Sequence, residues 1–394
     1  MKVPPCYIHG MGMINALGAN ATEVASGLAG ASPLARHALT LHDGRRVCVG
    51  AVTDALPALP AALMRHSTRN NRLLLAALRQ IEGEIAAAIA RFGAERVAVV
   101  MGTSTSGIDE GTMALAAAQG GAPLPTGYAY PQQELGAPAH FVSALTGCLG
   151  PAYTVSTACS SSARAFISAQ HLLLSGLADA VIVGGADTLC GLTLNGFYSL
   201  ESLAAGICTP FAAQRDGINI GEAAAVCLLT REPAAVALIG AGESSDAYHI
   251  SAPDPTGNGA AAAMQMALQQ AQMAAADVGY INLHGTGTRL NDAMEAKAVY
   301  RLFGDRVPCS STKPLTGHTL GAAGITEAAI AWLLLTGQAL LPAQWPPEMQ
   351  RDPQLEPVNL LAQGQPLLRP AVLSNSFAFG GNNVSLLFAR EPVA

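Results

Sequence analysis

The sequence predicts an α/β protein built in layers, and three observations lead to this fold class. Apolar runs typical of strands alternate with helical stretches from one end of the chain to the other, an alternation that favours a sheet covered by helices. Several runs are nearly continuous in β-branched and other apolar residues, as expected for strands buried on both faces. No Ser-rich or Pro-rich linker divides the 394 residues into separate bodies.

Ten segments have the composition of strands. In chain order they are residues 6–10, 97–101, 153–155, 180–183, 224–229, 236–239, 280–283, 307–310, 371–374 and 383–388. Five longer stretches between them are predicted as helices: residues 73–91, 161–175, 259–274, 293–303 and 325–336.

The two halves of the chain start alike. The strand and glycine turn at residues 7–12 is echoed at residues 236–242, and each half then reaches a helix start made of small residues, at Cys159 and near His318. The echo is short, so the residues alone leave open whether the fold is duplicated.

Composition and charge exclude several classes of protein. Hydrophobic residues make up 50% of the chain and charged residues 12%, against roughly 25% charged residues in a typical domain. A membrane-spanning helix needs about 20 mostly apolar residues, and the most apolar stretch, residues 322–341, is interrupted by Glu327, Thr336, Gly337 and Gln338. The net charge is −6 with no basic block, which argues against nucleic-acid binding. We therefore expect neither a membrane span nor a nucleic-acid partner.

The eight cysteines indicate a reducing compartment. No two of them form a Cys-x-x-Cys pair, so zinc spacing is absent, and a disulfide framework is not expected in so long a chain. The first residues, Met-Lys-Val-Pro-Pro, lack the apolar core of a signal peptide. The Gly-Met-Gly at residues 10–12 lacks the third glycine of a dinucleotide-binding loop. These features predict a cytoplasmic protein without a metal site.

Cys159 stands where a strand gives way to a long helix. Small residues end the strand, and an apolar helix starts at once with Cys159 in its first turn. Free N–H groups and the positive end of a helix dipole stabilise a thiolate, so we expect the thiol pKa to lie below its free value of about 8.5. The alternative is a buried structural cysteine. The flanking serines and the turn favour a nucleophile.

Two histidines lie among glycines and hydroxyl residues. His284 follows the predicted strand 280–283 and opens the run His-Gly-Thr-Gly-Thr, and His318 lies in the stretch 311–324. Packing seldom requires a histidine in such surroundings, and glycine lets a ligand approach the backbone closely. One cysteine and two such histidines together predict a catalytic site.

These three motifs resemble the Cys-His-His set of the elongating β-ketoacyl-acyl-carrier-protein synthases, the condensing enzymes of fatty-acid and polyketide synthesis. The resemblance runs from the motif at residues 8–18 to the Ser-Asn-Ser-Phe-Ala-Phe-Gly-Gly-Asn-Asn at residues 374–383. It implies a thiolase fold, in which two similar α/β halves form five layers, αβαβα. We then expect an N-terminal half, residues 1–232, that carries the cysteine, and a C-terminal half, residues 233–394, that carries both histidines.

The resemblance also implies a role for each matching residue. Cys159 attacks the acyl thioester, while His284 and His318 bind the carbonyl of a malonyl thioester and promote loss of carbon dioxide. The activity implied is that of an acyltransferase, a 3-oxoacyl-[acyl-carrier-protein] synthase. Supporting roles fall to the charged pair Lys313 and Glu327, the oxyanion-hole N–H groups of Cys159 and Phe379, the gate formed by Phe379, Gly380 and Gly381, and the phosphopantetheine-binding Thr286 and Thr288.

The chemistry of this reaction limits what else the site requires. Decarboxylation develops negative charge on the thioester oxygen, so two neutral imidazole N–H donors lower the barrier. No carboxylate base is needed, because carbon dioxide leaves in place of a proton. We expect no metal and no redox cofactor, and the phosphopantetheine arm belongs to the carrier protein.

The resemblance implies two kinds of partner. One is an acyl-carrier protein, and the other completes a homodimer or a heterodimer with a related chain-length partner. Carrier proteins are strongly acidic and this chain is itself −6, so docking requires a local basic patch. Arg65, Arg69 and Arg72 fall where the family places its docking helix. The alternative is that they are solvated charges at a helix start.

Three segments depart from the pattern of the fatty-acid enzymes: Thr-Pro-Phe-Ala at 209–212, Gly-Glu-Ala-Ala at 221–224 and the Gly-rich loop 102–107. They favour a specialised synthase, such as one making aryl-polyene or related polyketide chains, over a primary fatty-acid enzyme. A thiolase-type acyltransferase needs a second cysteine near the C-terminus, and Cys309 lies in the wrong motif. A catalytically silent dimer partner would lack Cys159.

Overall fold

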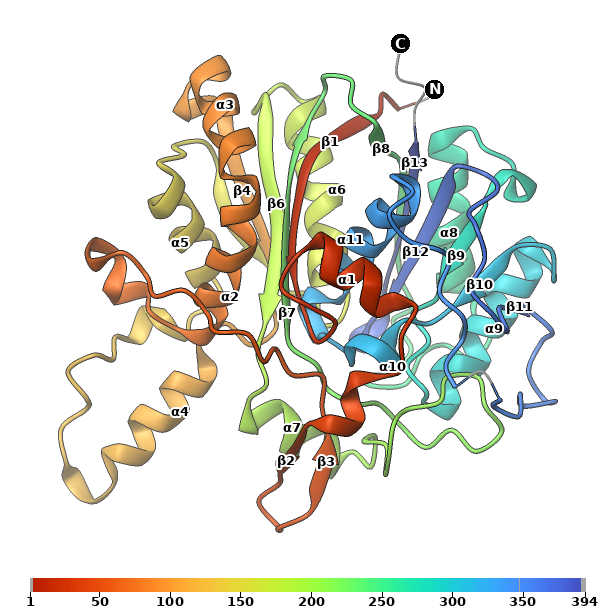
Figure 1. The fold of residues 1–394 in the computed structure, drawn as a ribbon, viewed down its shortest axis with the longest axis horizontal. Helices are drawn as coiled ribbons and strands as arrows, with labels where there is room; N and C mark the ends of the chain where they lie inside the picture. Colours follow the sequence, from red (N-terminus) through yellow and green to blue (C-terminus); the bar gives the residue numbers. More distant parts are fainter. Residues whose placement is uncertain (1–2, 347, 391–394) are drawn as a thin grey trace.

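Eleven strands are hydrogen-bonded to one another in one continuous order (Figure 1). The computed structural model describes residues 3–346 and 348–390. The strands are ordered β11-β10-β9-β12-β13-β8-β1-β7-β6-β4-β5. The short β11 (Asn359–Leu360) forms one edge, and a hairpin of β2 (Ala38–Thr40) and β3 (Arg46–Cys48) lies outside this sheet.

The N-terminal half contributes five of these strands. Near its edge, β4 (Val97–Gly102) pairs parallel with both β5 (Ala152–Val155) and β6 (Ala180–Asp187). Next to β6 lie β7 (Ala223–Thr230) and then β1 (Cys6–Ile14), each antiparallel to the strand before it. The edge of this half is β5.

The C-terminal half repeats the same order and the same directions. Here β9 (Tyr280–Asn282) pairs parallel with β10 (Pro308–Ser310) and β12 (Ala371–Phe377). Beyond β12 lie β13 (Asn382–Arg390) and then β8 (Val236–Ser245), again antiparallel. Antiparallel pairs between β1 and β8 join the two halves. The chain therefore contains one strand arrangement twice, as the echo in the sequence suggests, while the boundary at residues 232 and 233 stays a prediction.

Helices cover the outer face of each half (Figure 1). On the N-terminal half, α2 (Arg69–Leu78), α3 (Glu82–Phe92) and α5 (Ala137–Thr146) share a hydrophobic cluster with β4, β6 and β7. On the C-terminal half, α8 (Asn258–Ala271) and α9 (Arg289–Phe303) share another with β8, β9 and β12.

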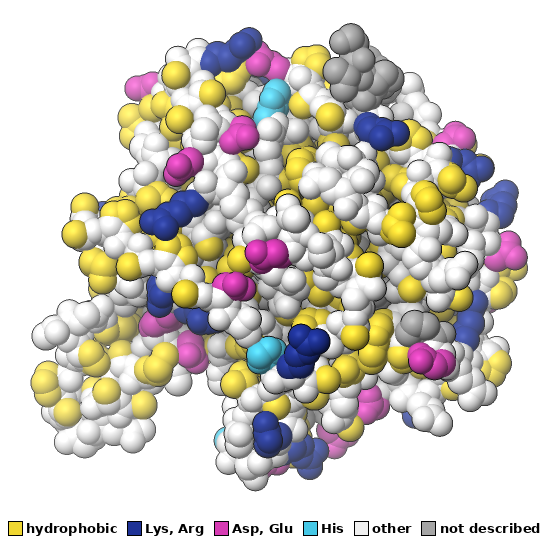
Figure 2. Space-filling view, viewed as in Figure 1, with side chains coloured by type: hydrophobic (Ala, Val, Ile, Leu, Met, Phe, Trp, Pro, Cys, Tyr) yellow, Lys and Arg dark blue, Asp and Glu magenta, His cyan; other side chains and the backbone are white. Residues whose placement is uncertain are grey.

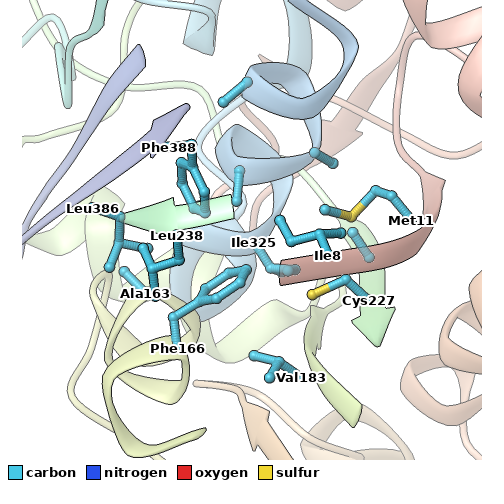
Figure 3. Close-up of a cluster of buried hydrophobic side chains, with 14 of the residues drawn as sticks. Ile8, Met11, Ala163, Phe166, Val183, Cys227, Leu238, Ile325, Leu386 and Phe388 are labelled. Atoms are coloured by element: carbon cyan, nitrogen blue, oxygen red, sulfur yellow. The ribbon is translucent and has the colours of Figure 1, made fainter. Parts of the chain in front are cut away.

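Two further helices form the middle layer. α6 (Ser161–Leu174) and α11 (Ala323–Leu335) pack into a single hydrophobic cluster with strands of both halves. Figure 3 shows Phe166 of α6, Ile325 of α11 and Phe388 of β13 in this cluster, and the Phe166 and Phe388 rings meet edge-on with centroids 5.5 Å apart. α11 is buried on almost every side, as its apolar composition requires. The five layers αβαβα confirm the predicted fold class.

All ten predicted strands are present, with ends shifted by a few residues. Five helices were absent from the sequence-based prediction: α5, α1 (Ala21–Leu28), α4 (Ile108–Ala117), α7 (Gly191–Ser199) and α10 (Lys313–Thr316). Over the described ranges, no helix is both long enough and apolar enough to cross a membrane.

One predicted helix is interrupted. The sequence predicts a single helix over residues 73–91, but the 3-10 turn Arg79–Ile81 separates α2 from α3. Ile81 has φ −129° and ψ 22°, outside the helical region. The amide of Gln80 donates to the carbonyls of Met13 and Ala19 and accepts from the Met13 N–H. A contact with the chain that leaves β1 thus overrides the local preference for a helix.

An arm projects from the body of the molecule beside the edge strand β5. This arm, residues 108–135, contains α4 and lies at the lower left of Figures 1 and 2. Its side chains between residues 111 and 133 include no charge, and four large apolar ones are exposed: Met113, Leu115, Leu124 and Tyr130.

Candidate active site

The turn between β5 and α6 holds Cys159. Ala158 takes a left-handed backbone conformation with φ 52°. Ser161 Oγ accepts a hydrogen bond from the Thr157 N–H and donates one to the Ala158 carbonyl, so this serine fixes the turn. Cys159 is only 6% exposed, and a substrate must reach it through a cavity.

His318 occupies the matching turn of the C-terminal half. It lies between β10 and α11, as Cys159 lies between β5 and α6. Its backbone N–H donates to the Asn219 carbonyl, and its Nε2 lies 3.0 Å from Cys159 Sγ. The duplicated arrangement therefore brings a thiol from one half and an imidazole from the other to the same point.

The other histidine follows β9. The backbone N–H groups of His284 and Gly285 donate to the two carboxylate oxygens of buried Glu295, each at 2.7 Å. Because Glu295 lies on α9, that helix fixes the backbone from which the His284 imidazole projects. The His284 ring meets the His318 ring edge-on with centroids 5.3 Å apart.

A buried ion pair lies behind the histidines. Lys313 Nζ is 2.6 Å from Glu327 Oε1, and both side chains are at most 4% exposed. The same ammonium lies 3.4 Å from His284 Nδ1. Glu327 comes from α11 and Lys313 starts α10, so the pair also ties these two elements together.

Both imidazoles are neutral at pH 7. Burial lowers the pKa of His284 and of His318 well below the ordinary value, and the nearby Lys313 charge lowers both further. Neutral imidazoles can accept a proton from a thiol and can donate an N–H to an oxygen that gains charge.

The thiol pKa departs from the sequence-based expectation. Burial raises the pKa of Cys159 to about 12, although the Lys313 charge and the backbone N–H groups of Phe379 and Cys159 itself act to lower it. The expectation of a depressed thiol pKa is therefore wrong, because loss of hydration outweighs the helix start. The resting site holds a neutral thiol beside a neutral imidazole.

The segment that follows β12, residues 378–381, forms the part of the site next to the Cys159 thiol. The Phe379 N–H acts on the Cys159 thiol, and the Phe379 ring packs 5.5 Å from the Phe197 ring. Gly380 and Gly381 follow with φ 79° and 76°, conformations that glycine adopts without strain. The structure thus brings the predicted oxyanion-hole donors together, while the gating role of this segment stays a prediction.

A cavity of about 400 Å³ leads from the surface to the thiol. Cys159, His284, His318 and Phe379 line it, and so do Thr286 and Thr288, whose hydroxyls lie 3.0 Å apart. The predicted pantetheine-binding threonines therefore stand on the path to the thiol. Across the described ranges, no three His, Cys, Asp or Glu side chains gather as a metal site would require.

The three arginines predicted to dock a carrier differ in their contacts. Arg65 is exposed and donates only to His66. Arg69 instead forms a two-pronged pair with Glu222, with N···O distances of 2.6 and 2.8 Å, and the Glu222 side chain is 1% exposed. Arg72 donates to the backbone carbonyls of residues 56 and 57. The docking role stays a prediction, and this geometry favours it for Arg65 over Arg69.

Besides Glu295, sequence reasoning missed another buried carboxylate at the site. Asp187, fully buried at the end of β6, accepts hydrogen bonds from the hydroxyls of Thr103 and Thr105 and from the backbone N–H groups of Ser104, Thr105 and Ala322. It thereby joins loops of the two halves. The sequence held a signal for it. An aspartate that ends an otherwise apolar strand is expected to be buried, and a buried carboxylate requires hydrogen-bond partners.

Family models match both halves of the chain. The model described as β-ketoacyl synthase, N-terminal domain, matches residues 7–235, and the one described as β-ketoacyl synthase, C-terminal domain, matches residues 235–344. Among curated relatives, a 3-oxoacyl-[acyl-carrier-protein] synthase 2 of Rhizobium meliloti is 38% identical over 260 residues, 61% of each chain. Nodulation protein E of Rhizobium meliloti is 35% identical over 263 residues, 63% of this chain and 64% of its own. The chain thus spans about three-fifths of the length of these relatives.

Solved structures match over nearly the full length. A ketosynthase (ApeO) from Xenorhabdus doucetiae, solved in complex with its chain length factor (ApeC), is 52% identical with a TM-score of 0.94, covering 98% of both chains. A β-ketoacyl synthase from Burkholderia phymatum is 27% identical with a TM-score of 0.87, covering 98% of this chain and 100% of its own.

Proposed function

The chain belongs to the β-ketoacyl synthase family, and from that premise we propose that it condenses an acyl thioester with malonyl-acyl-carrier protein, with loss of carbon dioxide. The observation that carries the proposal is the 3.0 Å contact between Cys159 Sγ and His318 Nε2, with the His284 ring against the His318 ring in one cavity.

The first step loads the acyl chain on Cys159. The thiol proton passes to His318 Nε2 as sulfur attacks the thioester carbonyl, because neither group is charged at rest. The backbone N–H groups of Cys159 and Phe379 stabilise the oxygen of the tetrahedral intermediate. When the C–S bond of the donor breaks, His318 returns the proton to the leaving thiolate.

The second step breaks the bond to the malonyl carboxylate. The electron pair of that bond moves to the thioester oxygen, carbon dioxide leaves, and the enolate carbon attacks the acyl-cysteine. Cys159 then leaves as a thiolate and takes up one proton from solvent, the proton that the overall condensation consumes. Lys313 faces His284 Nδ1, so the proton of this imidazole sits on Nε2, where it can be donated to the developing enolate oxygen.

His318 can serve both steps because the proton of its neutral ring can lie on either nitrogen. Nδ1 of His318 is buried and finds no hydrogen-bond partner among the described residues, so neither tautomer is fixed. With the proton on Nδ1, Nε2 accepts from the thiol, and with the proton on Nε2 it donates to the malonyl thioester oxygen. Neither step calls on a metal or redox cofactor.

The substrates arrive on a phosphopantetheine arm in this proposal. Thr286 and Thr288 line the cavity between the surface and Cys159, which supports their predicted contact with the arm. The carrier of that arm is an acyl-carrier protein, and the reaction takes place in the cytoplasm, where the eight cysteines, all free in the structure, stay reduced.

Polyketide synthesis with a chain-length partner is the pathway that the observations favour. The ketosynthase from Xenorhabdus doucetiae, 52% identical, was solved with its chain length factor. Two surfaces of this chain support such a partner: β5 is an open sheet edge, and the adjacent arm exposes apolar side chains without any charge between residues 111 and 133. An open edge can pair with a strand of another chain, and an exposed apolar patch is typical of a protein–protein contact.

Mass spectrometry of the intact protein tests the proposed function. After incubation with an acyl-carrier protein loaded with an acyl chain, we expect one acyl adduct on Cys159, and added malonyl-carrier should release it as a 3-oxoacyl product. The chain-length partner belongs in the assay, with the protein alone as the comparison. If the protein acquires no adduct with or without the partner, it is a scaffold and not an enzyme. If the acyl group is released from Cys159 without formation of carbon dioxide, the reaction is of the thiolase type.

A further inference from the structure

An exposed arginine lines the catalytic cavity. Arg289 follows Thr288 directly, and it takes part in none of the ion pairs within the described part of the chain. Asp352 has a lowered pKa, chiefly because of its hydrogen bond to Arg215 and in smaller part because of the Arg289 charge. The roles already assigned to the cavity do not use this guanidinium.

The backbone beneath Arg289 is held by buried ionic groups. Arg215, whose side chain is 5% exposed, donates to the Arg289 carbonyl at 3.3 Å and forms ion pairs with Asp292 and Asp352. Asp292 also accepts from the Gly287 N–H. The backbone that bears Thr288 and Arg289 is thus fixed. When Arg289 binds an anion, the entropic cost is therefore that of ordering its side chain and not of ordering the loop.

Two carboxylates, Glu201 and Asp216, line the same cavity. Their negative charges repel an anion, whereas the Arg289 charge attracts it. An anionic group that enters the mouth is therefore directed toward Arg289 and the adjacent Thr288.

We propose that Arg289 binds the phosphate of the phosphopantetheine arm at the mouth of the cavity. The inference rests on the proposed function, in which thioesters arrive on this arm. The thioester end of the arm passes Thr286 and Thr288 to reach Cys159, so the phosphate, at the opposite end of the arm, remains outside. A guanidinium offers parallel N–H donors that match phosphate oxygens.

Binding of the arm alone tests this site without any turnover. Phosphopantetheine and pantetheine differ only in the phosphate, and competition NMR can compare their affinities for the wild-type protein and for Arg289→Gln and Arg289→Lys. We expect about tenfold tighter binding of phosphopantetheine to the wild type, the gain of one charge-assisted hydrogen bond. Arg289→Gln should abolish this ratio, and Arg289→Lys should keep part of it.

Arg46→Gln is the matched control. Arg46 is exposed, is likewise in no ion pair of the described ranges, and lines a neighbouring hollow that shares Glu201 and Asp216 with the mouth. Its loss changes the net charge equally, so the affinity ratio should stay at about tenfold. Equal affinities in the wild type, a ratio that survives Arg289→Gln, or the same loss in Arg46→Gln would each overturn the proposal.

Acyl transfer separates this proposal from the proposed function. Acylation of Cys159 is measured from acyl-pantetheine, acyl-phosphopantetheine and acyl-carrier protein. Arg289→Gln should slow the two phosphate-bearing donors about tenfold and leave acyl-pantetheine unchanged. Equal slowing with acyl-pantetheine would overturn the phosphate site, because Arg289 would then support the cavity itself. A wild type that no donor acylates, but whose affinity ratio depends on Arg289, would overturn the proposed function and support the phosphate site.

Discussion

Cys159 is the residue on which every proposed step depends. Cys208 and Cys309 are also buried, but within the described ranges neither is hydrogen-bonded to a histidine, and Cys309 donates to the backbone of β11. Cys159→Ala should therefore abolish condensation, whereas Cys208→Ala and Cys309→Ala should retain most of it. A radiolabelled malonyl-carrier assay measures the three variants, and elongation by Cys159→Ala would contradict the mechanism.

The same thiol makes a prediction about pH. Because burial raises the pKa of Cys159 to about 12, the thiolate fraction at pH 7 is minute and grows about tenfold per pH unit until the pKa is reached. The rate of alkylation by iodoacetamide, followed by peptide mass spectrometry, should rise from pH 7 to pH 9.5 without a plateau. A plateau near pH 8 would show an ordinary or depressed thiol pKa instead.

The two histidines should differ in their partial reactions. Only His318 lies within 3.0 Å of the thiol, while His284 is bound to Lys313 through Nδ1. His318→Ala should therefore slow acylation of Cys159 by 10²-fold or more, the usual range for a general base, and His284→Ala should slow it little. Both variants should lose malonyl decarboxylation. Release of carbon dioxide at the wild-type rate by either variant would contradict the assigned roles.

At the scale of elements, Asp187 connects the two halves under the site. It accepts from the loop after β4 and from the 3-10 turn Leu320–Ala322. Asp187→Ala leaves several buried donors without an acceptor, so the free energy of unfolding should fall by about 3 kcal/mol. Urea unfolding measures the loss, with the exposed Asp305→Ala as control. A loss of less than about 1 kcal/mol would show that the loops hold without this carboxylate.

All ten predicted strands and four of the five predicted helices are present, whereas the helix predicted over residues 73–91 is interrupted. This difference has a physical reason. A strand such as β6 is buried along its whole length, so its composition alone reports its environment. The break between α2 and α3 depends on Gln80, which contacts residues more than sixty positions away. No local pattern encodes such a contact.

The site shows the same division between what is local and what is not. Motifs in the sequence identified Cys159, His284 and His318, and the structure brings all three together. The Cys159 pKa was misjudged because it depends on burial by the whole fold rather than on the helix start. Asp187 was overlooked because its partners come from two distant loops.

At the scale of the whole molecule, we expect charge reversal at Arg65 and at Arg69 to have different effects on carrier docking and on stability. Arg65→Glu should raise the KM for carrier-bound substrate about fivefold, flatten its dependence on salt and leave pantetheine thioesters unaffected, since exposed charges act mainly on association. Arg69→Glu should in addition lower the free energy of unfolding by about 2 kcal/mol, because it strands the buried Glu222.

Steady-state kinetics with both donor types and urea unfolding check these expectations. Arg91→Glu, near the end of α3, is the control for a changed net charge. Its partner Glu232 is 38% exposed, so the substitution strands no buried carboxylate. If Arg65→Glu weakened both donor types equally, Arg65 would support the fold and not the docking of a carrier.

The placement of Cys159 and His318 in corresponding turns of the two halves has a consequence for an incompletely folded chain. Each half supplies one member of the contact, and the turns that bear them adjoin α6 and α11, which pack together in one cluster. A chain in which this cluster has not formed has a thiol without its proton acceptor. Under the proposed function, we therefore expect acyl transfer to begin only in the completely folded molecule.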